Sequence, residues 1–305
     1  MGDIEKDILE KVSDLHNMQT GAYNIRINGA VGLRNTTANI DIVPKDDKSG
    51  IEIYIKENTK GESVHIPVIL SQTGFTDLVY NDFYIGENAD VTIVAGCGIH
   101  NGGNKKSEHD GIHTFNVGKN AKVKYIEKHY GDGEGTGERV LNPKTVVNIS
   151  DGGYMEMETT QIKGVDSTKR ETKAILGNDS ILIVKEKIFT HGSQHAETNF
   201  VVELNGKNSS TNVISRSVAK DDSNQIFLAK VNGNNKCAGH TECDAIIMDN
   251  ACVKAIPEIA ANNVDANLIH EAAIGKIAGE QLIKLMTLGL TEEEAEVQIV
   301  KGFLK

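Results

Sequence analysis

The segment GENADV at residues 86–91 returns 32 residues later as GKNAKV at residues 118–123. In both copies a glycine-asparagine turn leads directly into an alternating run. Looser copies begin near Gly152, Gly177 and Gly206, so successive glycines are 25 to 34 residues apart. Gly and Asn tolerate the positive φ of tight turns. A turn and a strand repeated at this period indicate a repeat architecture, in which each repeat stacks on the one before.

The segments between the turns alternate apolar and polar residues, as at residues 51–56, 122–125 and 155–158. Such alternation predicts strands with one buried face, and it continues to about residue 268. Aromatic residues make up only 5% of the chain and Trp is absent, so aliphatic residues must fill the core. Stacked coils suit small, similar side chains. The pattern therefore favours a mainly β protein, a parallel β-helix, over the alternative of a sandwich with glycine-rich turns.

Helical patterns flank the strands at both ends. Residues 3–17 carry apolar residues at three- and four-residue spacing. An apolar stripe over residues 274–286 predicts a second helix, which Gly289 is suited to end. Thr291 and Glu294 have the spacing of a capping box that opens a third helix.

These patterns divide the chain into three parts. We expect an N-terminal helix in residues 1–19, a β-helix core in residues 20–269 and a two-helix subdomain in residues 270–305. The last two helices either only cap the open end of the solenoid or also present a docking surface for a partner.

Charge and cysteine content exclude several classes of function. The chain has 32 Lys and Arg against 43 Asp and Glu, a net charge of −11, which argues against nucleic acid as a partner. No apolar run approaches the about 18 residues of a membrane span. The N-terminus lacks the features of a secretion signal. We therefore expect a cytoplasmic protein whose four cysteines are thiols or metal ligands rather than disulfides.

The densest group of potential metal ligands is Cys-x2-His-x2-Cys, formed by Cys237, His240 and Cys243. Thiolates and imidazoles bind zinc and other transition metals. On a strand the two cysteines share one face and His240 points to the other, unless Gly239 introduces a turn. The alternative is a pair of buried thiols without a metal.

A second group follows one repeat later. His270 and Glu271 lie 27 and 28 residues after Cys243, a separation that could place them beside Cys243 on stacked strands. A thiolate, an imidazole and a carboxylate together suit iron or another transition metal. Cys252, between the two groups, is expected to be a core thiol, because free cysteine is among the most buried residue types.

Cys97 lies between two glycines in AGCG at residues 95–98. We expect these glycines to leave its sulfur accessible and to allow close backbone approach; the alternative is a small residue at a tight corner. The glycine-rich stretch at residues 131–137 lacks the Gly-Lys-Ser/Thr ending of a phosphate-binding loop, so the chain itself should not hydrolyse ATP. This stretch is expected to be a flexible insertion between coils.

The C-terminal motifs resemble those of the SufB/SufD family of iron–sulfur cluster assembly proteins. The matching segments are HEAAIGKI at residues 270–277, GLTEEEA at 289–295, IVKGF at 299–303, CDAIIM at 243–248, GKNS at 206–209 and AGC at 95–97. The chain departs from the family where Ile283 and Lys284 replace a usual Phe-Tyr. The resemblance implies a right-handed parallel β-helix with a C-terminal helical subdomain.

The resemblance also implies roles for single residues. Cys243, His270 and Glu271 match the positions that hold a nascent cluster at the subunit interface, and Glu271 favours the SufB branch. Cys97 resembles the cysteine that receives sulfur. Cys237 and His240 have less secure counterparts and are candidate additional ligands.

By the same resemblance, the chain is a non-enzymatic scaffold for a transient iron–sulfur cluster. Its expected partners are a SufC-like ABC ATPase bound to residues 270–305, a sulfur donor and apo-protein recipients. Strands that start near residue 20 suggest a minimal SufB-like member that forms a homodimer through the β-helix. Two rivals remain from the residues alone: a structural zinc-binding solenoid, and a polysaccharide-active β-helix enzyme, which low aromatic content disfavours.

Overall fold

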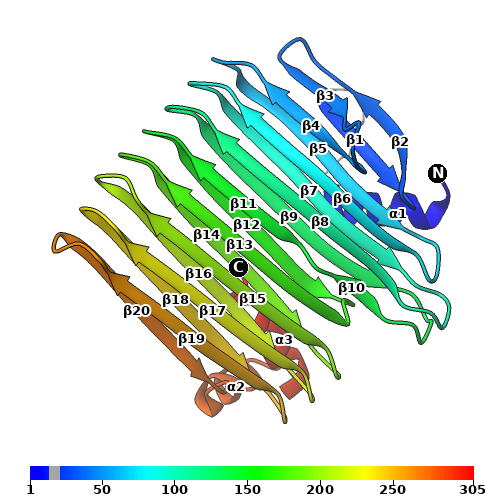
Figure 1. Cartoon of the computed structure of the whole chain (residues 1–305). Coiled ribbons are helices and arrows are strands. Elements are labelled where there is room, and N and C mark those ends of the chain that lie inside the picture. The colour runs from blue at the N-terminus through cyan, green and yellow to red at the C-terminus, as the bar shows by residue number, and fades with distance from the viewer. Residues whose placement is uncertain (14–20) are drawn as a thin grey trace.

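The computed structural model describes residues 1–13 and 21–305 and is a parallel β-solenoid flanked by helices (Figure 1). Helix α1 (Asp3–Ser13) begins where the sequence predicted. The predicted extension of this helix to residue 17 lies outside the described residues. Within these residues, no helix has both the length and the apolar character needed to cross a lipid bilayer.

Two ten-stranded sheets form the body of the solenoid. The strands of the first sheet are, in spatial order, β2 (Ala30–Asn35), β1 (Ala22–Ile27), β5 (Lys60–Leu70), β7 (Asp90–His100), β9 (Lys122–Asp132), β12 (Tyr154–Lys163), β14 (Ile181–Thr190), β16 (Ser209–Ala219), β18 (Cys237–Ile247) and β20 (Ala266–Gly275). The strands of the second sheet are β19 (Cys252–Ala261), β17 (Asn224–Gly233), β15 (His195–Leu204), β13 (Ser167–Leu176), β10 (Arg139–Leu141) with β11 (Lys144–Ile149), β8 (Ser107–Val117), β6 (Thr76–Ile85), β4 (Gly50–Ile55) and β3 (Ile40–Pro44).

From β4 to β20 the chain alternates between the two sheets, with β10 and β11 sharing one place in the second sheet. Neighbouring strands in this stretch are parallel, whereas β1 with β2 and β3 with β4 pair antiparallel at the N-terminal end. The core lies between the two sheets and is mainly aliphatic, with a few buried rings such as Phe83 and Phe115, stacked at 4.4 Å. The prediction of a mainly β solenoid with an aliphatic core is confirmed.

In the repeated turns, the asparagine and the glycine have different structural roles. Asn88 and Asn120 adopt the left-handed conformation, at φ 57° and 55°. Gly86 and Gly118 instead allow adjacent coils to approach, because a Cβ at Gly86 would lie 2.4 Å from the backbone nitrogen of Glu57. Asparagine thus supplies the positive φ and glycine the space, a division that the sequence pattern alone did not assign.

The C-terminal helices are α2 (Gly279–Met286) and α3 (Glu292–Phe303). The predicted capping box is present: the Glu294 amide donates to Thr291 Oγ1 at 3.2 Å, and the Thr291 amide donates to the Glu294 carboxylate at 2.9 Å. The boundary predicted after residue 269 falls inside β20, however, and Ile274 lies on this strand rather than on a helix. The helical segment therefore starts later than the sequence pattern suggested.

Candidate functional site

Cys97 points into the space between the two sheets from the middle of β7. Its side chain is 5% exposed and belongs to a buried apolar cluster. The other members of this cluster are Val68, Leu70, Ile99, Leu141 and Val165, with Phe75 packed against them. The sulfur is therefore covered, contrary to the expectation that the flanking glycines leave it accessible.

The two glycines beside Cys97 serve helix α1 instead. Gly96 and Gly98 face the outer side of the sheet, where a Cβ would lie 2.0 Å from the carbonyl oxygen of Val12 and 2.1 Å from Cγ2 of Ile8. Only glycine leaves room for a helix this close to the strand. The expected close backbone approach is thus present, but its partner is α1 on the face opposite the sulfur.

Two buried histidines face Cys97 from inside the solenoid. His129 on β9 is its in-register neighbour, and His109 reaches toward it from β8 of the opposite sheet. Burial alone would raise the pKa of the Cys97 thiol. The charges of His109 and His129 and their hydrogen bonds outweigh this effect and lower the pKa to about 7.

A larger ionic cluster continues from His129 into the core. Arg170 forms a buried ion pair with Glu127, and its Nε lies 3.6 Å from Glu186. Tyr125 donates to Glu127 at 3.0 Å. Because each charge has a partner of opposite sign, the cluster satisfies the condition under which ions are tolerated in a core.

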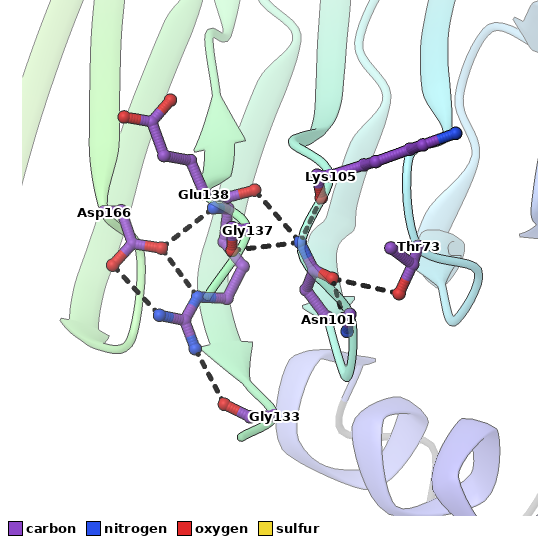
Figure 2. A network of polar contacts seen from close by, with 9 residues as sticks. Thr73, Asn101, Lys105, Gly133, Gly137, Glu138 and Asp166 are labelled. Atoms are coloured by element: carbon purple, nitrogen blue, oxygen red, sulfur yellow. Dashed lines mark hydrogen bonds and ion pairs between the residues drawn. The ribbon is translucent and has the colours of Figure 1, made fainter. Parts of the chain in front are cut away.

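A hydrogen-bonded network joins the loops around Asn101, four residues after Cys97 in the sequence (Figure 2). The Asn101 amide donates to the carbonyl oxygens of Lys105 and Gly137 at 2.8 and 3.0 Å, and Arg139 pairs with Asp166 at 2.7 Å. The glycine-rich stretch at residues 131–137 is therefore a hydrogen-bonded coil corner, which corrects the expectation of a flexible insertion. Backbone bonds from this stretch to residues 101 and 103 position β10, whose Leu141 packs against Cys97.

Cys243 lies on the inner side of β18, near the other end of the solenoid. It is 1% exposed and in register with Ser215, which donates to Glu186 at 2.7 Å. Burial, followed by the charges of Glu186 and Asp244, raises the pKa of the Cys243 thiol to about 12. The two cysteines are five strands apart in one sheet, a separation of about 24 Å at the usual strand spacing.

His270 and Glu271 lie on the next strand, β20, with different orientations. His270 pairs in register with Thr241 on the inner side, and its Nδ1 is 2.7 Å from the Thr241 hydroxyl. Glu271 faces outward, where its carboxylate lies 3.8 Å from Nε2 of His240. Cys243 itself is in register with Ala272, so His270 is its diagonal neighbour on the inner side and Glu271 is on the opposite face.

The remaining predicted positions also alternate between faces. Cys237 is buried on the inner side, whereas His240 faces outward and lies 3.1 Å from Asn212. Cys252 is only partly buried on β19, which corrects the expectation of a core thiol. Among residues 1–13 and 21–305, no three His, Cys, Asp or Glu side chains converge on a point that could hold a metal ion.

Sequence reasoning did not single out the polar residues that surround Cys97. Asp77, His109 and Glu127 are all buried, and each occupies an inward position of an alternating strand. The sequence did contain a signal: a charged or imidazole side chain at a position of the alternating strand that should face the core, as in HDGIHTF at residues 109–115. Such a residue must have a buried partner, although the sequence does not say which.

Comparison with known proteins identifies the family of this chain. The family model "SUF system FeS cluster assembly, SufBD core domain" matches residues 77–303. An iron–sulfur cluster assembly SufBD family protein of Methanocaldococcus jannaschii is 30% identical over 263 residues, covering 85% of this chain and 82% of the relative. A SufBD family protein of Pyrococcus horikoshii is 29% identical over 279 residues, covering 90% and 83%. The chain therefore belongs to the SufBD family of iron–sulfur cluster assembly proteins.

Proposed function

We propose that this chain is a scaffold subunit that holds a nascent iron–sulfur cluster at an interface between subunits. One observation carries the proposal: β20 is the terminal strand of its sheet, and it places His270 and Glu271 at a free edge, one strand from Cys243. A second subunit at this edge would meet an imidazole, a carboxylate and a thiol within one strand spacing. These groups are suitable ligands for iron.

The orientation of these residues supports a shared site. Within one chain His270 faces inward and Glu271 outward, so a cluster held by both must lie at the rim of the last coil, where a partner can complete the ligand set. Cys237 and His240 are additional candidates on the same strand as Cys243. A cluster held by few ligands per subunit is easier to release to an apo-protein recipient than one in a closed four-cysteine site.

The free edge also supports a homodimer through the β-helix. Both final strands, β19 and β20, have no strand paired to their outer edges among residues 1–13 and 21–305, and such edges readily pair with another strand. Ile256 on β19 and Ile269 on β20 are 51% and 49% exposed, which adds apolar surface at this end. A twofold axis beside β20 would bring two copies of His270 and Glu271 together.

The two C-terminal helices are the proposed docking surface for a SufC-like ABC ATPase. Exposed apolar side chains on and beside them include Ile283, Leu288 and Val297. ATP hydrolysis would take place in that partner, and its motion would open the interface that holds the cluster. We assign this assembly to the cytoplasm, where free thiols persist.

Cys97 is the proposed sulfur acceptor. Its thiolate would attack the terminal sulfur of a donor protein persulfide, forming one S–S bond as the donor S–S bond breaks. The donor cysteine leaves as a thiolate, so the exchange needs no external oxidant or reductant. Cys97 is then a persulfide, which can supply sulfur for the cluster.

Anaerobic reconstitution with iron and sulfide tests the scaffold proposal. The wild-type chain should develop the visible charge-transfer absorption of an iron–sulfur cluster, and Cys243→Ala should abolish it. Cys252→Ala is the matched control and should retain it, because Cys252 lies on the outer side of the other sheet. Stoichiometric zinc without this absorption in the wild type would favour a structural zinc-binding solenoid, although His240 points away from Cys237 and Cys243.

Light scattering on the complex co-expressed with the ATPase tests the proposed assembly. Two copies of this chain with two ATPase subunits are expected. A stable pair of one scaffold and one ATPase would contradict the homodimer. Replacing Ile269 and Ile256 with Lys should separate the two scaffolds while each keeps its ATPase.

A further inference from the structure

We propose that His109, held in place by Asp77, is a positioning residue that keeps the sulfur of Cys97 ionised as one half of a buried thiolate–imidazolium pair. The inference rests on the sulfur-accepting role proposed for Cys97 and names the residues that would make this cysteine a nucleophile. Its geometry comes from three consecutive strands that lie in two sheets: β7 in the first, and β6 and β8 in the second.

The Asp77–His109 pair is fixed by the stacking of coils. Asp77 on β6 and His109 on β8 are in register, and the Asp77 carboxylate lies 3.1 Å from Nδ1 of His109. This contact makes Nδ1 the donor to the carboxylate and leaves Nε2 for a second function. Nε2 is buried, in a side chain that is 2% exposed, and has no nitrogen or oxygen partner among the described residues, which leaves it to the Cys97 sulfur. The thiol of Cys97 is thus the group that can satisfy this buried nitrogen.

Arg26 holds the carboxylate of Asp77 from the other side. Its Nε and one terminal nitrogen donate to the two Asp77 oxygens at 2.9 and 2.7 Å, a bidentate contact. The same terminal nitrogen donates to Ser49 at 2.8 Å. Arg26, Asp77 and His109 are all buried, so the imidazole cannot turn without breaking this chain of contacts. The arrangement is that of a carboxylate orienting a histidine beside a thiol.

His129 also faces Cys97, but its ring nitrogens lie close to other partners. Nε2 lies 3.6 Å from Glu127, and Nδ1 lies 3.4 Å from Arg170. Burial lowers the pKa of His129, but the charge of Glu127 and the hydrogen bonds to Cys97 and Glu127 outweigh it and raise the pKa, while the charge of Arg170 opposes this rise. Tyr125 donates to the same Glu127. From β5 the in-register neighbour of Cys97 is the apolar Val68. Among the described groups that face the thiol, His109 is therefore the imidazole whose remaining nitrogen has no other nitrogen or oxygen partner and can hold the thiol proton.

Electrostatics agree with this geometry. Burial lowers the pKa of His109, but the charge of Cys97 and the hydrogen bond to Asp77 outweigh it and raise the pKa to about 10. The pKa of Cys97 moves in the opposite direction. The imidazolium and the thiolate stabilise each other, so both ions are expected at neutral pH.

Site-resolved alkylation tests the inference on the full-length protein. Iodoacetamide labelling of each cysteine is followed by mass spectrometry between pH 5 and pH 10. Cys97 should reach half of its maximal labelling rate near pH 7, and His109→Asn should move this midpoint upward. The labelling rate at pH 7 should fall about tenfold, because an ordinary thiol is only a few per cent ionised there. Comparing pH profiles removes the effect of burial on the absolute rate.

Two further variants separate positioning from folding. Asp77→Asn should shift the midpoint in the same direction, because an amide does not stabilise the imidazolium. His113→Asn is the matched control: this buried histidine lies on the same strand but contacts Tyr125, so the Cys97 profile should not move. If His109→Asn does not fold, His109→Gln takes its place. The pH midpoint of Cys97 can then also be measured from thiolate absorption, as the difference between the protein with Cys97 and its Cys97→Ser variant.

Equal midpoints in wild type and His109→Asn would overturn the inference. A second measurement, transfer of sulfane sulfur from glutathione persulfide to Cys97, separates the two proposals. A low midpoint without any sulfur transfer would uphold the ion pair and overturn the sulfur-accepting role. Sulfur transfer that is equally fast in His109→Asn at pH 7 would uphold the acceptor and overturn the positioning role.

Discussion

Cys97 and Cys243 occupy equivalent backbone environments but opposite electrostatic ones. Both lie on the inner side of the same sheet and both are almost completely buried. Cys97 faces two histidines, whereas Cys243 lies near the carboxylate of Glu186 inside the solenoid and is followed by Asp244 on the outer face. The pKa of the first thiol is lowered and that of the second is raised. The two cysteines thus have the same orientation in the solenoid, and the side chains of the neighbouring coils determine which sulfur is ionised.

The two regions also differ in how they are closed. Helix α1 packs tightly over Gly96 and Gly98 behind Cys97, and an apolar cluster covers the thiol from inside. Cys243 lies one strand from the end of its sheet, where the last coil has no following coil to cover it. A buried nucleophile and a ligand near an open rim suit two successive steps, sulfur entry and cluster assembly.

The largest expected effect distinguishes the two cysteines by the source of sulfur. With a persulfide donor and iron, Cys97→Ser should lose nearly all cluster formation, whereas with free sulfide it should form clusters like the wild type. Cys243→Ser should fail with both sources. Cluster absorption after anaerobic desalting measures the yield. Normal assembly by Cys97→Ser from the persulfide donor would remove the functional contrast between the two regions.

The ionic cluster between the two cysteines should be costly to break. Arg170→Met should lower the free energy of unfolding by about 3–5 kcal/mol, because Glu127 would be left as an unpaired buried charge. Lys144→Met is the control, since its exposed pair with Glu171 contributes only about 0–1 kcal/mol. Urea denaturation measures both changes.

The loss in Arg170→Met should also depend on pH. Burial raises the pKa of Glu127, but Arg170 and His129 outweigh it and hold the pKa well below the usual value. The wild type therefore has this stabilisation above the unfolded-state pKa of about 4 and loses it as the pH falls further. The difference in the free energy of unfolding between wild type and Arg170→Met should therefore become smaller at acidic pH. A constant difference down to pH 3 would show that Glu127 is not the group left unpaired.

The packing of helix α1 against β7 behind Cys97 should be sensitive to the addition of a single methyl group. Gly96→Ala would place a Cβ 2.0 Å from the carbonyl oxygen of Val12, so α1 must move away from β7. We expect a loss of about 1–3 kcal/mol and faster amide hydrogen exchange in residues 3–13. Gly102→Ala should have little effect, because the nearest atom to its Cβ lies 3.6 Å away. Unchanged exchange in α1 would mean that the helix does not depend on this contact.

The smallest expected effect concerns the hydroxyl beside His270. Thr241→Val removes the 2.7 Å contact with Nδ1 of His270 and should cost about 1 kcal/mol. Thr211→Val on the neighbouring strand is the matched control: its buried hydroxyl has no hydrogen-bond partner in the described part of the chain, so the change should be neutral or stabilising. Equal effects of the two substitutions in thermal unfolding would show that Thr241 does not hold His270.

Sequence analysis predicted the solenoid, the terminal helices and the closeness of Cys243 to His270 through their separation by about one coil. It could not predict their register. The coil from β18 to β20 pairs residues 29 apart, whereas Cys243 and His270 are 27 apart, so they are offset by two residues and share one face. Glu271 is one residue further along and faces outward. A difference of one residue in coil length would exchange the two orientations, because side chains alternate along a strand.

The partners of Cys97 were beyond prediction for a different reason. Asp77, His109 and Arg26 lie 20, 12 and 71 residues from Cys97, and none has a characteristic spacing to it. They meet because β6 and β8 are neighbours in the sheet opposite β7, and because Arg26 on β1, two strands from β7, reaches Asp77. Similarly, the glycines beside Cys97 indicated a close approach correctly, but the sequence did not identify the element that approaches.

Local sequence alone thus determined that this chain forms stacked coils, because the repeated turns and the period-two alternation act within a few residues. It also determined that alternate positions of each strand share one face. Only the tertiary structure decided which inward groups meet, since contacts between the two sheets depend on the length of each coil and the register between neighbouring coils. That arrangement places one thiol beside two imidazoles and the other near the buried carboxylate of Glu186, and so gives two similar cysteines different chemistry.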